Sequence, residues 1–195
     1  YGYDLHDLET GEVTPLYASS ITNHTIALYA KNGSLQVYDT DTGKLLTDTT
    51  AGLVENQQTV MLNNEGNGYV WLELRDSNSY DVTATCVYGP DGLAADLSSL
   101  LDTYNYLGYL TTDPDGKSLF YGTRSAAGTA YSTVSDVLDT GGNVVIPGLS
   151  YCYGYYSNSL NGLPEHTFAA KRGFYAGWMD TTGQWVYCQS IFASV

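Results

Sequence analysis

The side chains best suited to chemistry in this sequence are its three histidines and 21 acidic residues, and their spacing indicates no catalytic centre. His6, His24 and His166 stand far apart, so no paired-histidine metal motif is present. No serine lies in a Gly-x-Ser-x-Gly turn, which presents the nucleophile of many hydrolases. The sequence therefore predicts a protein that is not an enzyme and that needs no cofactor.

Two aspartate-rich segments, residues 39–43 and 113–116, resemble parts of a calcium-binding loop. Neither segment continues to the glutamate that completes such a loop. Aspartate followed by glycine is also what a tight turn requires, because the carboxylate accepts backbone N–H groups and glycine adopts a positive φ. We therefore predict turns at these segments, and no metal site.

Aromatic residues offer a binding surface instead. The chain has 19 tyrosines but only four phenylalanines, and tyrosine combines a flat apolar ring with a polar tip. Residues 151–165 bring several tyrosines together with Ser, Asn and Gly, a composition suited to adaptable contacts. The candidate ligand-binding residues are Tyr151, Tyr153, Tyr155, Tyr156 and Trp71. Two other interpretations stay open: alternation places the odd-numbered tyrosines of residues 151–155 on one face of a buried strand, and tyrosine is an ordinary strand former.

A repeated strand–turn–strand unit has to position these side chains. Its clearest copy is residues 173–187, where Trp178 and Trp185 flank a turn from Asp180 to Gly183. Other copies cover residues 137–147, 37–46 and 5–13, and a degenerate one covers 87–94. By subtraction of their numbers, the turn glycines lie 32, 49, 50 and 41 residues apart: Gly11, Gly43, Gly92, Gly142 and Gly183. Most of these spacings are typical of propeller blades and similar β arrays.

Equivalent positions in the copies carry similar residues, which we expect to face inward. Before the turn these are Leu5, Val37, Val87, Val137 and Trp178, and after it they are Val13, Leu45, Ala94, Val144 and Trp185. Four cations also recur after the first strand of a copy: Lys31, Arg75, Arg124 and Lys171. They are either ordinary solvated turn residues or a ring of positive charge that faces an anionic partner.

The last sixty residues resemble the WG β-repeat of bacterial proteins. In that repeat, a Gly-aromatic step is followed by an aliphatic residue, Asp, two variable residues and Gly. Gly177-Trp178-Met179-Asp180 with Gly183 matches this core, and Val145-Ile146-Pro147 matches its exit strand. The resemblance implies repeated β structure, often on secreted or surface proteins, and it implies no reaction.

The expected fold is therefore all-β, as a β-propeller or propeller-like array of about five units in a single domain over residues 1–195. The alternative is a β-sandwich or an open array. Helical spacing of leucines predicts at most one short helix, at residues 94–103. Cys86, Cys152 and Cys188 fit no zinc motif, and one disulfide among them stays open.

Composition limits the partners. A net charge of −14 argues against nucleic acid and anionic membrane surfaces, which need clustered Lys and Arg. No apolar run approaches the roughly 20 residues that cross a bilayer, so membrane insertion is not expected. The chain begins at Tyr1, and we interpret it as a processed fragment. Together these features predict an extracellular or cell-surface module that binds a glycan or a protein. The alternatives are a propeller-type glycan hydrolase with paired carboxylates and a structural spacer.

Overall fold

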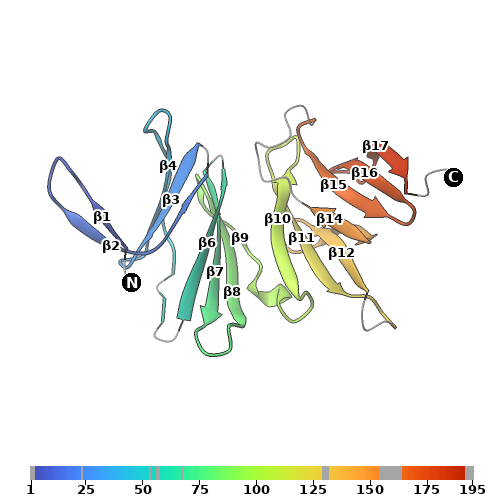
Figure 1. Ribbon diagram of the computed structural model, residues 1–195, viewed down its shortest axis with the longest axis horizontal. Helices are drawn as coiled ribbons and strands as arrows, with labels where there is room; N and C mark the ends of the chain where they lie inside the picture. Colours follow the sequence, from blue (N-terminus) through green and yellow to red (C-terminus); the bar gives the residue numbers. More distant parts are fainter. Residues whose placement is uncertain are drawn as a thin grey trace. The chain divides into compact units, whose positions relative to one another are not determined.

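The computed structural model describes residues 3–22, 24–52, 54–55, 58–66, 68–128, 132–153 and 164–191. Within these residues the chain is all-β, with four antiparallel sheets in which each strand pairs with its neighbours in sequence (Figure 1). None of the four sheets is closed into a barrel. Contacts divide the chain into two compact units, Tyr1–Ser98 and Ser99–Val195, which are described separately.

The first unit holds two sheets. The first sheet has the order β1 (Tyr3–His6), β2 (Val13–Ile21), β3 (Thr25–Ala30), β4 (Ser34–Asp39) and β5 (Leu45–Thr50). The second sheet has the order β6 (Gln58–Gly66), β7 (Tyr69–Asp76), β8 (Val82–Gly89) and β9 (Gly92–Asp96).

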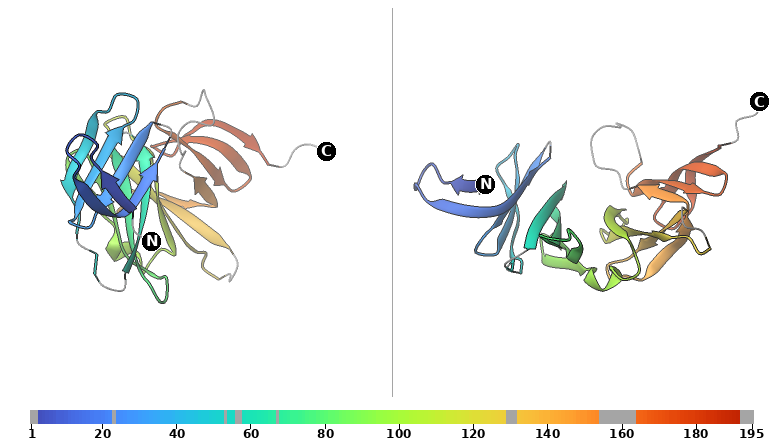
Figure 2. Two further views of the ribbon diagram at one scale, coloured as in Figure 1. Left: turned by 60° about the vertical axis from the view of Figure 1, so that its left-hand side comes forward. Right: turned by 60° about the horizontal axis from the view of Figure 1, so that its bottom comes forward.

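The second unit holds the other two sheets. The third sheet has the order β10 (Tyr106–Thr112), β11 (Ser118–Ser125), β12 (Thr133–Leu138) and β13 (Val144–Leu149). The fourth has the order β14 (Tyr151–Tyr153), β15 (Thr167–Arg172), β16 (Tyr175–Asp180) and β17 (Trp185–Ser190). Figure 2 shows from two further sides that the strands of each sheet follow one another in sequence order.

Two of the predicted elements differ in the structure. Residues 94–103 do not form an α-helix; β9 ends at Asp96, and a short 3-10 helix covers Ser98–Leu100. Leucine spacing is misleading here because Leu93 and Leu97 belong to a strand end and its exit, where neighbouring strands fix the conformation. The predicted copy at residues 5–13 is the β1–β2 hairpin, which is part of the first sheet and does not form a separate fifth sheet (Figure 1).

The aspartate turns of the predicted repeat are confirmed. In six hairpin turns, one carboxylate oxygen accepts the backbone N–H two residues later and another N–H three or four residues later; the aspartates are Asp7, Asp39, Asp76, Asp113, Asp139 and Asp180. The residues 39–43 and 113–116 are thus turns whose carboxylates complete the backbone hydrogen bonding. Five of these six turns close with a glycine at positive φ.

A β-bulge recurs at the same place in all four sheets, between the last two strands. The register shifts directly after Val37 in β4, Val87 in β8, Val137 in β12 and Trp178 in β16. At each bulge the last strand holds one extra residue, which changes how it pairs with the strand before it. The recurrence shows that these four positions are structurally equivalent, as the sequence repeat predicts.

The predicted inward orientation holds for the three valines before the turn and for Trp185 after it. It is wrong for four exposed residues: Leu5, Val13, Leu45 and Val144. Val37, Val87 and Val137 are all 0% exposed, whereas Leu45 is 40% and Val144 49% exposed. The prediction for these exit residues is wrong because the bulge shifts the register of the last strand. The buried cross-strand partners of the three valines are Thr47, Ala95 and Ile146.

Each unit has a core between its two sheets. In the first unit, Ala27 and Val37 pack in one apolar cluster with Val70 and Leu72. In the second unit, Val137 and Ile146 pack with the fourth-sheet residues Cys152, Phe168, Ala170 and Met179. In the first unit, therefore, the first sheet packs against the second with the face that carries Val37. In the second unit, the third sheet packs against the fourth with the face that carries Val137. No helix among the described residues is long and apolar enough to cross a membrane.

Candidate functional site

A row of paired residues crosses every sheet at the recurring bulge. In the first three sheets the row runs through buried residues: Ala27–Val37–Thr47, Trp71–Val87–Ala95 and Tyr121–Val137–Ile146. In the fourth sheet it is Tyr153–Ala169–Trp178–Tyr187. There Ala169 and Trp178 are half-buried, while Tyr153 is 42% and Tyr187 51% exposed, so this row is less covered in the last sheet.

A second row lies beside it on the same face of the fourth sheet. Tyr151 pairs with Lys171, Lys171 with Ala176, and Ala176 with Gln189. Because strand residues two apart share a face, both rows form one surface. We call this surface the aromatic face; its residues are Tyr151, Tyr153, Ala169, Lys171, Ala176, Trp178, Tyr187 and Gln189.

The opposite side of the fourth sheet fixes which way the aromatic face points. Cys152, Ala170 and Met179 lie on that opposite side and are buried in the core of the second unit. Their strand neighbours therefore point away from this core. Gly177 lies where β16 approaches β17 so closely that a Cβ atom would come 2.7 Å from the Cys188 Cα and closer still to the Tyr187 carbonyl oxygen.

The aromatic residues of the aromatic face lie on two sides of strand β15, which itself carries no aromatic residue on this face. On β14, the rings of Tyr151 and Tyr153 are nearly parallel, with an interplanar angle of 8° and centroids 6.3 Å apart. On β16 and β17, Trp178 pairs with Tyr187, whose hydroxyl accepts a hydrogen bond from the Gln189 amide. Between these edges, β15 presents only Ala169 and the Lys171 side chain. The small Ala169 therefore lies between Tyr153 on one side and Trp178 on the other.

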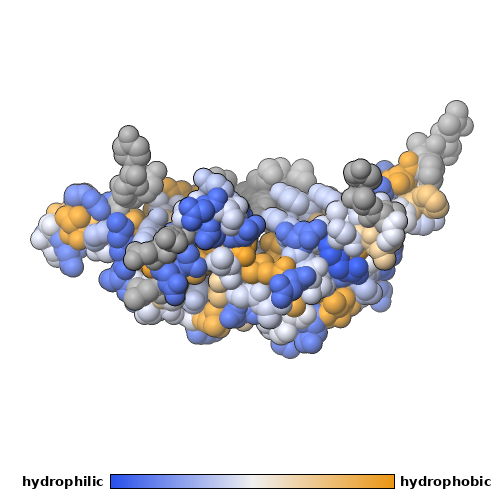
Figure 3. Space-filling view, turned by 90° about the horizontal axis from the view of Figure 1, so that it is seen from below, coloured by the Kyte–Doolittle hydropathy of each residue, from blue (hydrophilic) through white to orange (hydrophobic). Residues whose placement is uncertain are grey.

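Other apolar side chains of the fourth sheet are also exposed. Phe174 is 60%, Val186 50% and Ile191 46% exposed. In Figure 3, apolar residues in orange are visible beside the C-terminal end of the chain on the right.

The structure treats the predicted binding residues differently. Tyr151 and Tyr153 lie on strand β14 and are exposed, whereas Cys152 between them is buried. The two tyrosines therefore share one face of a strand, as alternation predicted, but it is the exposed face. Tyr155 and Tyr156 lie outside the described residues. Trp71 is only 2% exposed, and its Nε1–H donates to Glu73, so its prediction as a ligand-binding residue is not supported. Trp71 and the two tyrosines also belong to different units.

Sequence reasoning missed two members of the aromatic face. The repeat predicts that Trp178 and Trp185 both face inward; Trp185 packs against the core, whereas Trp178 lies on the aromatic face. Tyr187 is not among the residues predicted to bind a ligand. A signal was present: Trp178 stands where three other copies carry valine, and only an uncovered position accommodates so large a change.

Two carboxylates are buried, and both are paired with arginine. Glu73 accepts hydrogen bonds from Trp71 and from Arg75, the latter at 2.7 Å. Asp136, whose side chain is 3% exposed, accepts from Arg124, from the Tyr104 hydroxyl and from the Gly148 N–H. Burial raises the pKa of Asp136, but the Arg124 guanidinium and the Gly148 N–H lower it more, so the group stays ionised. Arg75 and Arg124 are thus committed to internal ion pairs and do not join a ring of free cations.

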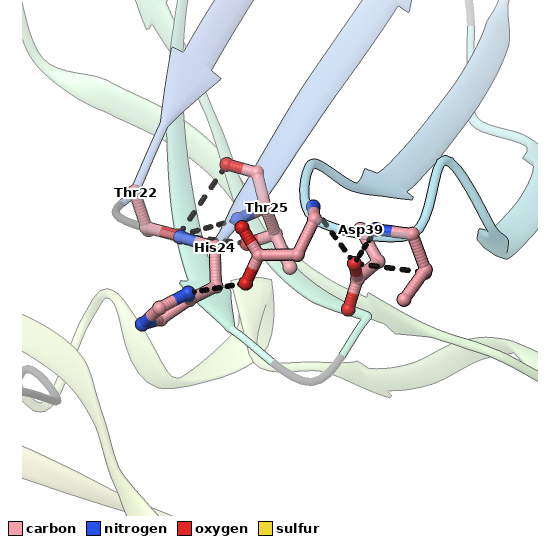
Figure 4. A network of polar contacts seen from close by, with 6 residues as sticks. Thr22, His24, Thr25 and Asp39 are labelled. Atoms are coloured by element: carbon pink, nitrogen blue, oxygen red, sulfur yellow. Dashed lines mark hydrogen bonds and ion pairs between the residues drawn. The ribbon is translucent and has the colours of Figure 1, made fainter.

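A histidine–aspartate contact links two turns of the first unit (Figure 4). The Nδ1 atom of His24 lies 2.8 Å from the Asp41 carboxylate, and the His24 carbonyl accepts the Thr40 N–H. Both side chains are well exposed, at 60% and 64%. Next to them, the hydroxyls of Thr22 and Thr25 bond to each other. The contact therefore fastens the β2–β3 turn to the β4–β5 turn, and it presents no free nucleophile.

The remaining reactive groups are also structural. His166 bonds to the Thr112 carbonyl through Nδ1, at 2.8 Å. All three cysteines are free thiols, and burial raises the pKa of Cys152 to about 12. Within the described part of the chain, no group of three or more His, Cys, Asp or Glu is arranged to hold a metal ion. The aromatic face is therefore the feature of the structure best suited to a ligand.

Comparison with known proteins identifies a family. No curated protein matches the chain. Among solved structures, the chain is similar to the crystal structure of the computationally designed Ika4 protein, at 12% sequence identity and a TM-score of 0.33, covering 97% of this chain and 99% of that chain. Residues 1–195 match the family described as a domain of unknown function (DUF5046), and the chain therefore belongs to this family.

Proposed function

We propose that this chain is a non-enzymatic binding module of an extracellular or cell-surface protein, and that it binds a glycan on its aromatic face. One observation carries the proposal. The row that is buried in the first three sheets is Ala169–Trp178–Tyr187 in the fourth, where Ala169 and Trp178 are half-buried and Tyr187 is exposed, with the exposed Tyr153 paired to Ala169. Large exposed aromatic groups reduce solubility unless a partner covers them, so their presence supports a binding role.

The shape and polarity of the aromatic face favour a sugar. Tyr153 and Trp178 lie on strands separated by β15, so their backbones are about 9.5 Å apart at the usual strand spacing. One sugar ring over Ala169 can contact both aromatic rings at about 3.5–4 Å. The Gln189 amide and the Lys171 amine can donate hydrogen bonds to sugar hydroxyls around it.

The proposed architecture is a propeller-like array, as the repeat suggested. The recurring bulge and aspartate turns support sheets that are copies of one unit, in keeping with the resemblance to the WG β-repeat. We propose that the fourth sheet presents its aromatic face to a ligand.

Catalysis is not part of this proposal. A glycan hydrolase of the propeller type would need an acid kept protonated near neutral pH, which burial without a cationic partner provides. The buried Asp136 instead has an arginine partner and a lowered pKa. Glu73 likewise binds Arg75. Both acids act as structural anions.

One observation favours a second candidate, in which the aromatic face packs against another protein sheet. In each unit the equivalent face of the first sheet covers the next sheet. A further sheet, from a longer chain or a second copy, would fit that pattern. Lys171 favours a ligand, because the corresponding position of the first sheet is the buried Tyr29.

The proposal is tested on a glycan array with the purified chain, followed by titration of each hit. Tyr153→Ala and Tyr187→Ser should each weaken binding about fivefold, since one aromatic–sugar stack contributes on the order of 1 kcal/mol. Phe174→Ala removes an equally exposed ring outside the aromatic face and should leave binding unchanged. Thermal unfolding verifies that each variant is folded.

Two results would overturn the proposal. The first is an array without hits that depend on Tyr153 or Tyr187. The second is a concentration-dependent dimer in sedimentation that Tyr187→Ser abolishes, which would assign the aromatic face to protein–protein contact.

A further inference from the structure

The fourth sheet differs in charge from the rest of the chain. The whole chain has 21 acidic and 7 basic residues, whereas residues 167–191 contain Lys171, Arg172 and a single acid, Asp180. The sheet that carries the aromatic face is thus locally positive by one charge in a protein of net charge −14. The acidic surface of the rest of the protein would repel an anionic ligand, whereas the fourth sheet would not.

Lys171 is the cation that the aromatic face itself presents. It sits in the second row between Tyr151 and Ala176, whereas Arg172 lies on the opposite side of the sheet, with its guanidinium near the Pro147 carbonyl. Ion pairs within the described residues involve Arg75, Arg124, His24 and His166, and Lys171 is not among them. Its amine is therefore available to an external anion.

The single acid of this sheet is held away from Lys171. The Asp180 carboxylate accepts the Thr182 hydroxyl at 2.7 Å and the backbone N–H groups of Thr182 and Gln184. Partial burial raises the pKa of Asp180, but these hydrogen bonds lower it more, so the group stays ionised within its own turn. Lys171 thus keeps its positive charge uncompensated beside three aromatic rings.

We propose that the aromatic face selects glycans that carry a carboxylate, such as uronic-acid residues. This inference rests on the proposed glycan-binding function and adds its substrate class. A sugar ring stacks over Ala169 between Tyr153 and Trp178, and its carboxylate accepts a charge-assisted hydrogen bond from Lys171 in the neighbouring row. Gln189 lies at the end of that same row and donates to a second oxygen of the ligand.

The test uses an array of matched pairs, in which each uronic-acid oligosaccharide is printed beside its methyl ester. The ester keeps the ring and removes the charge. We expect the acid form to bind about tenfold more tightly than its ester. Lys171→Met should remove this preference, Lys171→Arg should keep it, and Lys44→Met, which removes an exposed cation in the first unit, should leave it unchanged.

The outcomes separate the two proposals. Hits that depend on Tyr153 but bind acid and ester equally would overturn the carboxylate preference and leave glycan binding intact. A preference that persists in Lys171→Met would overturn the role of this residue. An array with no hit that depends on Tyr153 would overturn both proposals together.

Discussion

Tyr80 occupies in the β7–β8 turn the place that Gly43 occupies in the β4–β5 turn. Gly43 has a φ of 70° and donates its N–H to the carbonyl of Asp39; Tyr80 has a φ of 63° and donates to the carbonyl of Asp76. The left-handed conformation costs an ordinary residue roughly 1–2 kcal/mol. The β7–β8 turn therefore has the same left-handed closing residue as the β4–β5 turn, without a glycine.

Tyr80→Gly should stabilise the protein. The relief of the left-handed strain exceeds the entropy lost in ordering a glycine, which leaves a gain of about 0.5–1 kcal/mol. The measurement is the midpoint of urea or thermal unfolding. Ser79→Gly, one position earlier, is the matched control and should not stabilise. A lower midpoint for Tyr80→Gly would show that the Tyr80 ring has a packing role that outweighs the strain.

Gly177→Ala should destabilise the fourth sheet strongly. A Cβ atom at this position would lie 2.7 Å from the Cys188 Cα and closer still to the Tyr187 carbonyl oxygen, and backbone cannot move aside as a side chain can. We expect a loss of more than about 2 kcal/mol in the free energy of unfolding. Gly52→Ala is the control, since its Cβ would meet no atom within 4 Å. Equal stability of the two variants would contradict the close approach.

Arg124→Met should destabilise the third sheet at neutral pH, because it leaves the buried Asp136 carboxylate without its cation. The pKa of Asp136 should rise in the variant, since the remaining partners are the Tyr104 hydroxyl and the Gly148 N–H. The penalty should therefore shrink when acid protonates Asp136. Unfolding measured at pH 7 and pH 3 checks this, and a penalty that is independent of pH would argue for lost packing alone.

Acid should destabilise the aspartate turns. The pKa of Asp39 is lowered first by the Thr42 N–H, and those of Asp7 and Asp76 by the N–H groups of Thr10 and Ser79. A folded pKa below the unfolded one gives stability that is present above about pH 4 and is lost as the pH falls through the folded pKa. Melting temperature against pH from 2 to 6 measures this loss. Asp39→Asn keeps an acceptor oxygen but does not titrate, so its acid loss should be smaller than that of Asp91→Asn, the control.

Cysteine alkylation should follow burial. Burial raises the pKa of Cys86 to about 11 and that of Cys152 to about 12, so both are almost entirely in the unreactive thiol form at pH 8. Cys188 is half-buried on the edge strand β17. Brief treatment with iodoacetamide and peptide mass spectrometry should show Cys188 modified first and Cys152 last. Modification of Cys152 at the rate of Cys188 would contradict the burial of β14 against the core.

Much of the fold follows from local sequence. Aspartate and glycine at fixed spacing predicted the hairpin turns, and the structure confirms them at Asp7, Asp39, Asp139 and Asp180. These signals are reliable because the hydrogen bonds that make the turn lie within five residues. Alternating apolar residues likewise placed most strands. The helix predicted at residues 94–103 failed because pairing with β8 extends the chain through Asp96.

The candidate site was predictable only in part. Composition pointed to Tyr151 and Tyr153, but it also pointed to Trp71, which is buried, and the repeat placed Trp178 in the core. An alternating strand reveals that two faces differ, but not which face a neighbouring sheet covers. The bulge adds a second uncertainty, because one inserted residue moves every later side chain to the other face.

The sequence by itself thus determined the repeating unit, its turns and the equivalence of Val37, Val87, Val137 and Trp178, since each depends on contacts between near neighbours in the chain. Only the tertiary structure decided that three of these positions are buried and that the fourth belongs to an exposed aromatic face. The physical reason is that burial depends on the packing of one sheet against another, and this contact joins residues far apart in sequence.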